Sequence, residues 1–285
     1  MVDSPVILVG ADGSDPGRNA IVWAAHWAKQ HGGRLVLLTV ADLTPFSDAA
    51  AILEDAEHDA HVLADKELEY FTALGIDVPV ETRVRSGVPT EVFEDESAEA
   101  DLIVVGTHKG GLFKDALFGA RGVRIAAASK VPVAVIPVLP DNERHGIVVG
   151  VSFDGSAENA IRYAAETAQQ TGEPLRLVAS WTMPVAPGYD AAWSYDISNS
   201  LREETEQALD ELRDDILSTY PDLRIFSTVQ EGGPVHTLAD AGRDAVLTVV
   251  GNHSRNTLGR LLLGSVSHGL LNNITSPVII VRRGK

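Results

Sequence analysis

The sequence predicts an α/β fold made of two tandem units, each with a parallel sheet that helices cover on both faces. Short, continuous apolar runs recur along the chain, and such runs are typical of strands buried on both faces. Segments with helical spacing separate them, which favours parallel strands joined by crossover helices. A set of short motifs then returns 140 to 145 residues later, which indicates duplication of one unit.

Five apolar runs mark the strands of the first half. They occupy residues 6–9, 35–40, 78–84, 102–105 and 131–136. Between the second and third runs, residues 53–74 carry apolar side chains near the helical period, and Gly75 follows as a helix-ending glycine. The polar stretch 140–145 is typical of a linker, so we expect one domain over 1–139 and a second over 146–285.

The second half repeats the motifs of the first. Asp12-Gly13-Ser14 returns as Asp154-Gly155-Ser156, and Val104-Val105-Gly106 returns as Val249-Val250-Gly251. Gly106 and Gly251, Gly119 and Gly264, and Pro132 and Pro277 are each 145 residues apart. Such a constant offset across several motifs indicates a tandem duplication.

The two halves differ in the loop after the second strand. The first half has residues 41–50 there, whereas the second has the longer segment 181–200, with Tyr189, Trp193 and Tyr195. A loop after a parallel strand lies at the carboxyl edge of the sheet, where ligands bind in open α/β folds. The longer loop could be a lid, could contact an adenine or a partner, or could simply pack its aromatic side chains on the neighbouring half.

Composition restricts the partners of the chain. It has 285 residues, 45% of them hydrophobic, and a formal net charge of -17. That charge argues against binding a nucleic acid or an anionic membrane. Cys is absent, which excludes disulfides and thiolate chemistry. The first residues resemble no signal peptide and no apolar run is long enough for a bilayer, so we expect a cytoplasmic protein with no membrane partner.

The loop after the fourth strand carries the chemistry. In the second half it reads Gly251-x2-Ser254-x9-Gly264-Ser265, and in the first half Gly106-x2-Lys109-x9-Gly119-Ala120. Glycine lets backbone N–H groups approach an anion, and the start of a helix leaves unpaired N–H donors. The simpler interpretation is an ordinary strand–loop–helix connection. The common motifs of P-loop NTPases, dinucleotide enzymes, zinc proteases and α/β-hydrolases are absent.

These loops resemble the G-x2-G-x9-G-[ST] signature of the universal stress protein family, and residues 5–283 resemble its tandem form. The resemblance implies two Rossmann-like (adenine nucleotide alpha hydrolase-like) units, each with a five-stranded parallel sheet. It also implies ATP, with or without Mg²⁺, at the carboxyl edge of each sheet, and a regulatory role in stress adaptation with an unknown protein partner. The closing strands would pair the halves as an internal pseudo-dimer, and a further homodimer is expected.

The resemblance also implies the residues that bind the nucleotide. In the second half they are Asp154, Ser180, Val250, Gly251, Ser254, Gly264, Ser265, Val266 and Ser267, and in the first half Asp12, Val40, Gly106, Lys109, Gly119 and Ala120. The two aspartates would lie near adenine and ribose; alternatively, they only form the turn and cap of Asp-Gly-Ser. No metal-ligating residue is expected, because His108 and His253 have no second histidine at ligand spacing. No catalytic residue is expected either, because the sequence shows no dedicated catalytic base.

The second site is expected to bind better than the first. Lys109 stands where the signature has glycine, and Ala120 lacks the hydroxyl that Ser265 supplies. Two alternatives remain open. The chain could be a slow ATPase in which Asp154 or His253 orients water, or an interaction module that binds no nucleotide.

Overall fold

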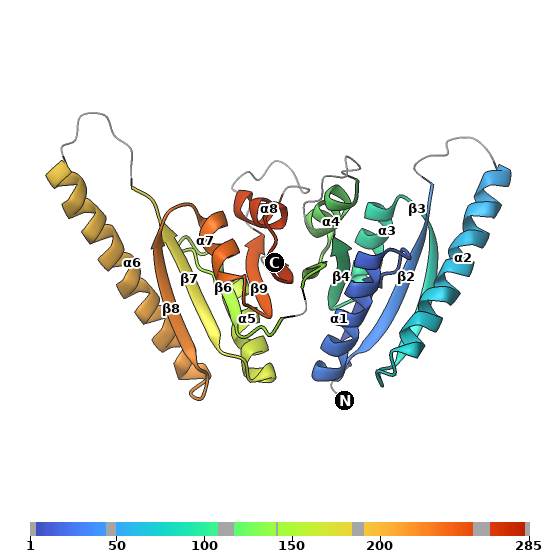
Figure 1. Ribbon diagram of the computed structural model, residues 1–285, viewed down its shortest axis with the longest axis horizontal. Helices are drawn as coiled ribbons and strands as arrows, with labels where there is room; N and C mark the ends of the chain where they lie inside the picture. The colour runs from blue at the N-terminus through green and yellow to red at the C-terminus, as the bar shows by residue number, and fades with distance from the viewer. Residues whose placement is uncertain are drawn as a thin grey trace. The chain divides into compact units, whose positions relative to one another are not determined.

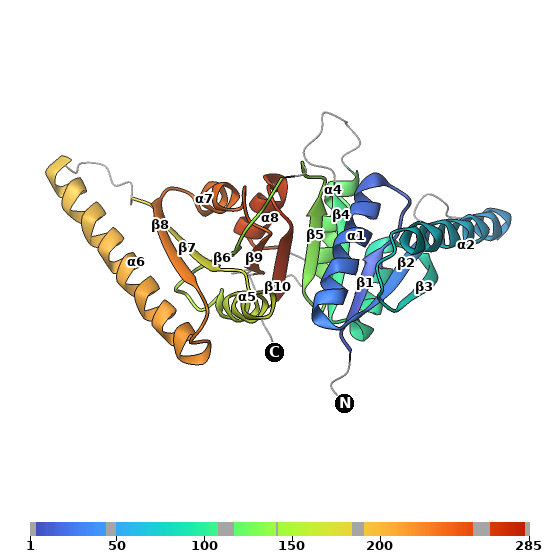
Figure 2. The same ribbon diagram turned by 60° about the horizontal axis from the view of Figure 1, so that its bottom comes forward.

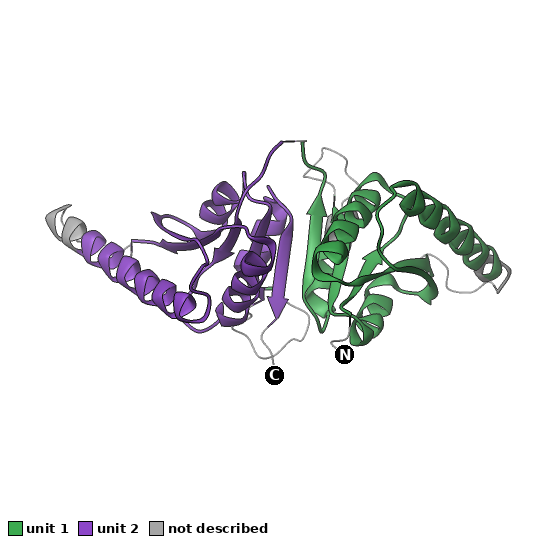
Figure 3. Ribbon diagram, turned by 90° about the horizontal axis from the view of Figure 1, so that it is seen from below, with its two compact units in different colours: residues 1–140, 254–263 green, residues 141–253, 264–285 purple. Residues whose placement is uncertain are grey.

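The computed structural model describes residues 4–43, 50–107, 117–140, 142–183, 191–252 and 263–282 (Figure 1). These residues form two compact units, which Figure 3 colours separately. Unit 1 contains the described residues up to Pro140, and unit 2 contains 142–252 and 264–282. Among the helices in these ranges, none combines the length and the apolar character needed to cross a bilayer.

Unit 1 is a five-stranded parallel sheet with helices on both faces. Its strands are β1 (Val6–Gly10), β2 (Arg34–Asp42), β3 (Val80–Gly87), β4 (Leu102–Thr107) and β5 (Val133–Pro137), in the spatial order β3-β2-β1-β4-β5. Its helices are α1 (Asp15–His31), α2 (Ala50–Ala73), α3 (Pro89–Glu96) and α4 (Leu117–Ala128), and a 3-10 turn, η1 (Ser97–Glu99), follows α3. Right-handed crossovers place α1 and α2 on one face and α3 and α4 on the other.

Unit 2 repeats this architecture. Its strands are β6 (Ile147–Gly150), β7 (Leu175–Trp181), β8 (Ile225–Glu231), β9 (Leu247–Asn252) and β10 (Val278–Arg282), in the order β10-β9-β6-β7-β8. Its helices are α5 (Glu158–Thr171), α6 (Ala191–Thr219), α7 (Pro234–Ala241) and α8 (Ser265–Asn272), which Figure 2 shows from a second side. The predicted fold class, two tandem five-stranded parallel units, is confirmed.

The inner strands are buried on both faces, as their unbroken apolar runs predict. Leu8 of β1, Ile103 of β4 and Val148 of β6 are each no more than 1% exposed. The edge strand β3 differs, because charged residues alternate with uncharged ones along it and many of its side chains are exposed. Its Arg83 and Arg85 pair with the buried Glu96 of α3. Charges on an edge strand oppose pairing with another chain.

Capping residues determine where α1 begins and ends. Ser14 is the N-cap of α1, and its side chain accepts a hydrogen bond from the backbone of Gly17. Gly32 ends α1 with a φ of 64°, a left-handed conformation that favours glycine. The chain therefore leaves β1 through a short, capped turn that fixes the start of α1 against the sheet.

Candidate functional site

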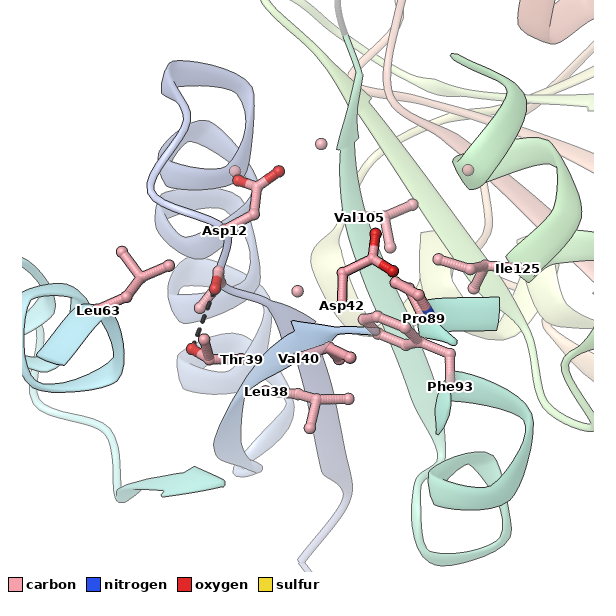
Figure 4. Close-up of a pocket in the computed structure, with 15 residues that line it drawn as sticks. Asp12, Leu38, Thr39, Val40, Asp42, Leu63, Pro89, Phe93, Val105 and Ile125 are labelled. Atoms are coloured by element: carbon pink, nitrogen blue, oxygen red, sulfur yellow. Dashed lines mark hydrogen bonds between the residues drawn. The ribbon is translucent and has the colours of Figure 1, made fainter. Parts of the chain in front are cut away.

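A cavity of about 270 Å³ lies at the carboxyl edge of the unit 1 sheet, where β1, β2 and β4 end (Figure 4). The residues that line it are Gly10, Ala11, Asp12, Gly17, Leu38, Thr39, Val40, Asp42, Leu63, Pro89, Phe93, Val105, Gly106, Gly122 and Ile125. Its size is near the lower end of the range for small-molecule sites.

The topology of the sheet creates this cavity. The chain leaves β1 toward β2 on one side and later returns to β4 on the other side. The connections therefore diverge between β1 and β4, and open α/β folds bind ligands at such a switch point. Asp12, Val40 and Gly106 are predicted site residues, and all three line the cavity.

The walls of the cavity are mainly apolar. Leu38 and Val40 project from β2, Phe93 comes from α3 and Ile125 from α4 (Figure 4). Phe93 is 5% exposed, and a Cβ added at Gly10 would lie 3.1 Å from its ring carbon Cζ. The bare backbone of Gly10 therefore leaves room for the phenylalanine ring beside the strand. Walls of this kind suit a flat apolar group such as a base.

Asp12 organises the turn after β1. Its Oδ1 accepts hydrogen bonds from the Ser14 backbone N–H at 3.0 Å and from the Ser14 hydroxyl at 2.6 Å. This is the turn and cap role that the sequence left open as the alternative to ligand binding. Asp12 also lines the cavity, so the same carboxylate is placed where a ligand could reach it.

Gly106 is required by packing. A Cβ at this position would lie 2.1 Å from the carbonyl oxygen of Pro16 and 2.7 Å from the backbone nitrogen of Gly17. In unit 2, a Cβ at Gly251 would lie 2.7 Å from the carbonyl oxygen of Ser156. Both glycines thus let the fourth strand of a unit approach the start of its first helix. Packing alone therefore explains why glycine recurs at this position, and no bound phosphate is needed to account for it.

In unit 2, the predicted site residues Gly264, Ser265, Val266 and Ser267 form the start of α8. Gly264 is the N-cap of α8, and its N–H donates to Oδ1 of Asn252 at 3.3 Å. Ser267, which is 1% exposed, donates its hydroxyl to the carbonyl oxygen of Gly251 at 2.8 Å. Ser265 is exposed at the start of the helix. The hydroxyl of Ser267 therefore holds β9 against α8, whereas that of Ser265 faces the surroundings.

The two aspartates of the repeated Asp-Gly-Ser motif do not hold equivalent positions. Asp12 lies two residues after the end of β1, whereas Asp154 lies four residues after the end of β6. Ser152 is the residue at the Asp12 position, and its hydroxyl donates to Oδ1 of Asp154 at 2.8 Å. Asp154 also accepts a hydrogen bond from the backbone of Ser156 at 3.0 Å, so the turn is the same but shifted toward the helix.

The remaining predicted residues vary in how far the structure describes them. Ser180 is half-buried near the end of β7, Val250 is buried in β9, and Val266 is half-buried in the first turn of α8. Gly119 and Ala120 lie in the first turn of α4. Lys109, His108, His253, Ser254 and Tyr189 lie outside the described residues.

Sequence reasoning missed several lining residues. Asp42 ends β2, and Pro89 and Phe93 lie on α3. The position of Asp42, a carboxylate directly after an apolar strand, was a signal that could have identified it. Phe93 could not be identified in this way, because its place beside Gly10 depends on a helix that packs across the sheet.

Among the described residues that line the cavity, the charged ones are Asp12 and Asp42, and none is Lys, Arg or His. Among the described residues, no group of three or more histidine or acidic side chains is placed to hold a metal ion. The described part of the cavity therefore suits the uncharged, hydrogen-donating part of a ligand better than a bare phosphate chain.

Comparisons with known proteins show which family the chain is similar to. A family model described as "Universal stress protein family" matches residues 5–137 and 143–282. A universal stress protein of Mycolicibacterium smegmatis is 27% identical over 97% of this chain and 96% of its own length. Universal stress protein Rv2005c of Mycobacterium tuberculosis is 27% identical over 97% of each chain. A solved universal stress protein from Archaeoglobus fulgidus superposes with a TM-score of 0.72 at 19% identity, covering 99% of this chain and 100% of its own.

Proposed function

The chain belongs to the universal stress protein family, and on this premise we propose that it is a regulatory protein that binds ATP at the carboxyl edge of each sheet. The single observation that supports this proposal most is the unit 1 cavity, which brings together Asp12, Val40 and Gly106 at the switch point. Its apolar walls suit adenine, and its acidic residues suit the donors of a base or a ribose. We further propose that the protein acts in the cytoplasm and forms a homodimer.

Unit 2 is proposed to hold the phosphates better. Its loop keeps Gly264 and Ser265 of the signature. The backbone N–H groups at the start of α8 and the exposed hydroxyl of Ser265 are suitable donors to a phosphate. Mg²⁺ would enter with the ATP and keep waters in its shell, because this ion is usually held by few protein ligands.

The decisive experiment is to denature protein purified from cells and identify the released small molecules by chromatography. We expect an adenine nucleotide. Thermal unfolding with added ATP provides the second readout, since saturation at 100 times Kd stabilises a protein by about 2.7 kcal/mol. Absence of nucleotide together with an unchanged melting temperature would refute the proposal.

Two variants test which unit binds ATP. Val40→Trp would fill the unit 1 cavity. Ser265→Ala would remove the unit 2 hydroxyl that is proposed to donate a hydrogen bond to phosphate. Val62→Trp, at an exposed position of α2, and Ser218→Ala, on the outer surface of α6, are the matched controls. We expect the first pair to reduce the ATP-induced shift and the controls to leave it unchanged. Phosphate release above background would identify a slow ATPase instead.

A further inference from the structure

The edge strand of unit 2, β8, presents an exposed and mostly uncharged outer edge. It stands last in the strand order of its sheet, so within the described ranges no strand pairs with its outer side (Figure 1). Phe226 is 57% exposed, and Ser227, Thr228 and Gln230 are exposed as well. Glu231, at its end, is the one charged residue of the strand. An edge without internal charge can serve as a template for a further strand.

The backbone groups of β8 alternate between β7 and the outer edge. Just before the strand, the carbonyl oxygen of Arg224 accepts a hydrogen bond from Leu175 N–H at 2.9 Å. Just after it, the N–H of Gly232 donates to the carbonyl oxygen of Trp181 at 2.9 Å. Successive residues of a strand direct these groups to opposite sides. The residues whose N–H and C=O face outward are therefore Ile225, Ser227, Val229 and Glu231.

Thr228 is the residue of unit 2 that is equivalent to Arg83 of unit 1. Leu38 and Val178 hold the same place in the two second strands, because each accepts a hydrogen bond at 2.9 Å from the residue after the first strand. Arg83 lies beside Leu38, and Thr228 lies beside Val178. The two edge strands can therefore be compared residue by residue.

Ion pairs cover the edge strand of unit 1 but not that of unit 2. Arg83 pairs with Glu81 of its own strand at 2.8 Å and with Glu99 of η1 at 3.1 Å. In unit 2, Thr228 and Phe226 stand at the positions of Arg83 and Glu81. Charges on an edge strand oppose pairing with another chain, and β8 lacks them at these positions. Because both units share one fold, that fold does not itself require the uncharged edge.

We propose that β8 is an interface at which two copies of this chain pair antiparallel, with a two-fold axis through Thr228. This inference gives the proposed homodimer its interface and is independent of nucleotide binding. An isologous contact of this kind uses the same surface of both copies. Centred on Thr228, the axis pairs the whole strand with itself and sets no like charges opposite each other. The resulting pairs are Ile225 with Glu231, Ser227 with Val229, Phe226 with Gln230, and Thr228 with its own copy.

This register suits both the backbone and the side chains. Every outward-facing residue meets another outward-facing residue, as hydrogen-bonded pairs require. Thr228 meets its own copy in a non-hydrogen-bonded pair, where side chains lie closer and threonine pairs are favourable. Phe226 gains a side chain of the second copy as a neighbour, which removes apolar surface from water. The same axis in unit 1 would set Arg83 against Arg83, and like charges directly opposite each other destabilise a pair.

The register can be tested by disulfide formation in the full-length protein, because the chain contains no cysteine. In Thr228→Cys, the two introduced thiols would lie on residues whose Cα atoms are about 4.5 Å apart, within disulfide range. Ser227→Cys is the matched control. Its two copies would lie on a diagonal, about 7–8 Å apart, beyond the reach of a disulfide. Mild oxidation followed by a non-reducing gel reports the covalent dimer.

Sedimentation of the unmodified protein over a range of concentrations measures the dimer itself. It is run at about 0.5 M salt, which screens the repulsion between two chains that each carry a formal charge of -17. Thr228→Lys sets two like charges opposite each other and should raise the Kd of the dimer about tenfold. Thr82→Lys, at an exposed position of β3, is the control and should leave the Kd unchanged. Circular dichroism verifies that both variants are folded.

We expect Thr228→Cys to form a covalent dimer and Ser227→Cys to remain largely monomeric. Equal cross-linking of the two cysteine variants would overturn the proposed register. A dimer with the same Kd in Thr228→Lys and in wild type would overturn this interface while leaving the proposed homodimer in place. Monomers at every concentration would refute the homodimer as well and leave the edge to a partner of another kind. The ATP-induced melting shift measures nucleotide binding separately.

Discussion

Replacing Gly106 by alanine should destabilise the protein severely, because the new methyl group has no space. It would lie 2.1 Å and 2.3 Å from the carbonyl oxygen and carbon of Pro16 and 2.7 Å from the nitrogen of Gly17. All three are backbone atoms, so no side chain can rotate away. Either β4 or the start of α1 must shift. Overpacking in a core costs about 1–3 kcal/mol and occasionally more, and we expect Gly106→Ala to reach the upper end.

Two further substitutions calibrate that loss. A Cβ at Gly251 meets one atom closer than 3 Å, the carbonyl oxygen of Ser156 at 2.7 Å, so Gly251→Ala should cost less. A Cβ at Gly122 has its nearest neighbour at 3.7 Å, and this glycine is helical. Gly122→Ala should therefore stabilise the protein, by about 0.5–1 kcal/mol.

Urea unfolding followed by circular dichroism measures all three variants. The expected order of unfolding midpoints is Gly122→Ala highest, then wild type, Gly251→Ala and Gly106→Ala. The slope of each transition shows whether the comparison is between the same states. A midpoint of Gly106→Ala equal to that of wild type would show that packing does not require glycine at this position. The alternative, that glycine lets the backbone approach a bound phosphate, would then be favoured.

Three more predictions follow from buried or capping groups. Arg18→Ala should lower the unfolding midpoint more than Arg18→Ala with Glu67→Leu, because the single change strands the fully buried carboxylate that Arg18 bonds at 2.9 Å; urea titration of both variants checks this, and equal losses would contradict it. Desolvation, followed by the nearby charge of Glu166, raises the pKa of Tyr163, so its contribution to stability is complete below a pH of about 10 and falls above it. The midpoint should therefore drop as the pH rises from about 10 to about 12 in wild type, but less in Tyr163→Phe. Ser14→Ala removes the N-cap bond to Gly17 and should cost about 1 kcal/mol in the same unfolding assay, and no loss would show that the cap is dispensable.

The fold could be predicted from the sequence because its signals are local or repeated. Continuous apolar runs identify the inner strands, and the constant offset between motifs identifies the second unit without any knowledge of packing. The edge strand was harder to bound: the pattern predicts 78–84, whereas β3 is Val80–Gly87. Its charged residues pair with α3 across space, as Arg85 does with Glu96 at 2.6 Å, and a one-dimensional pattern does not contain that partner.

The site was predictable only in part, for a related reason. Asp12 and Val40 were predicted from the resemblance to the family, and the rule that parallel strands end at one edge of a sheet explains why both line the same cavity. Matching the Asp-Gly-Ser letters in the second half was misleading, because the turn there is shifted by two residues and Ser152 takes the place of Asp12. The Asp-Gly-Ser motif predicts a turn. The position of that turn relative to the preceding strand depends on how the following helix packs.

The duplication also separates what the fold requires from what a ligand can use. Gly106 and Gly251 recur because each lets a strand touch the start of a helix, so their recurrence says nothing about phosphate. Positions that the scaffold does not fix have diverged: the end of the second strand carries Asp42 in one unit and Thr182 in the other. The difference between Asp42 and Thr182 is therefore one that the shared packing of the two units does not require.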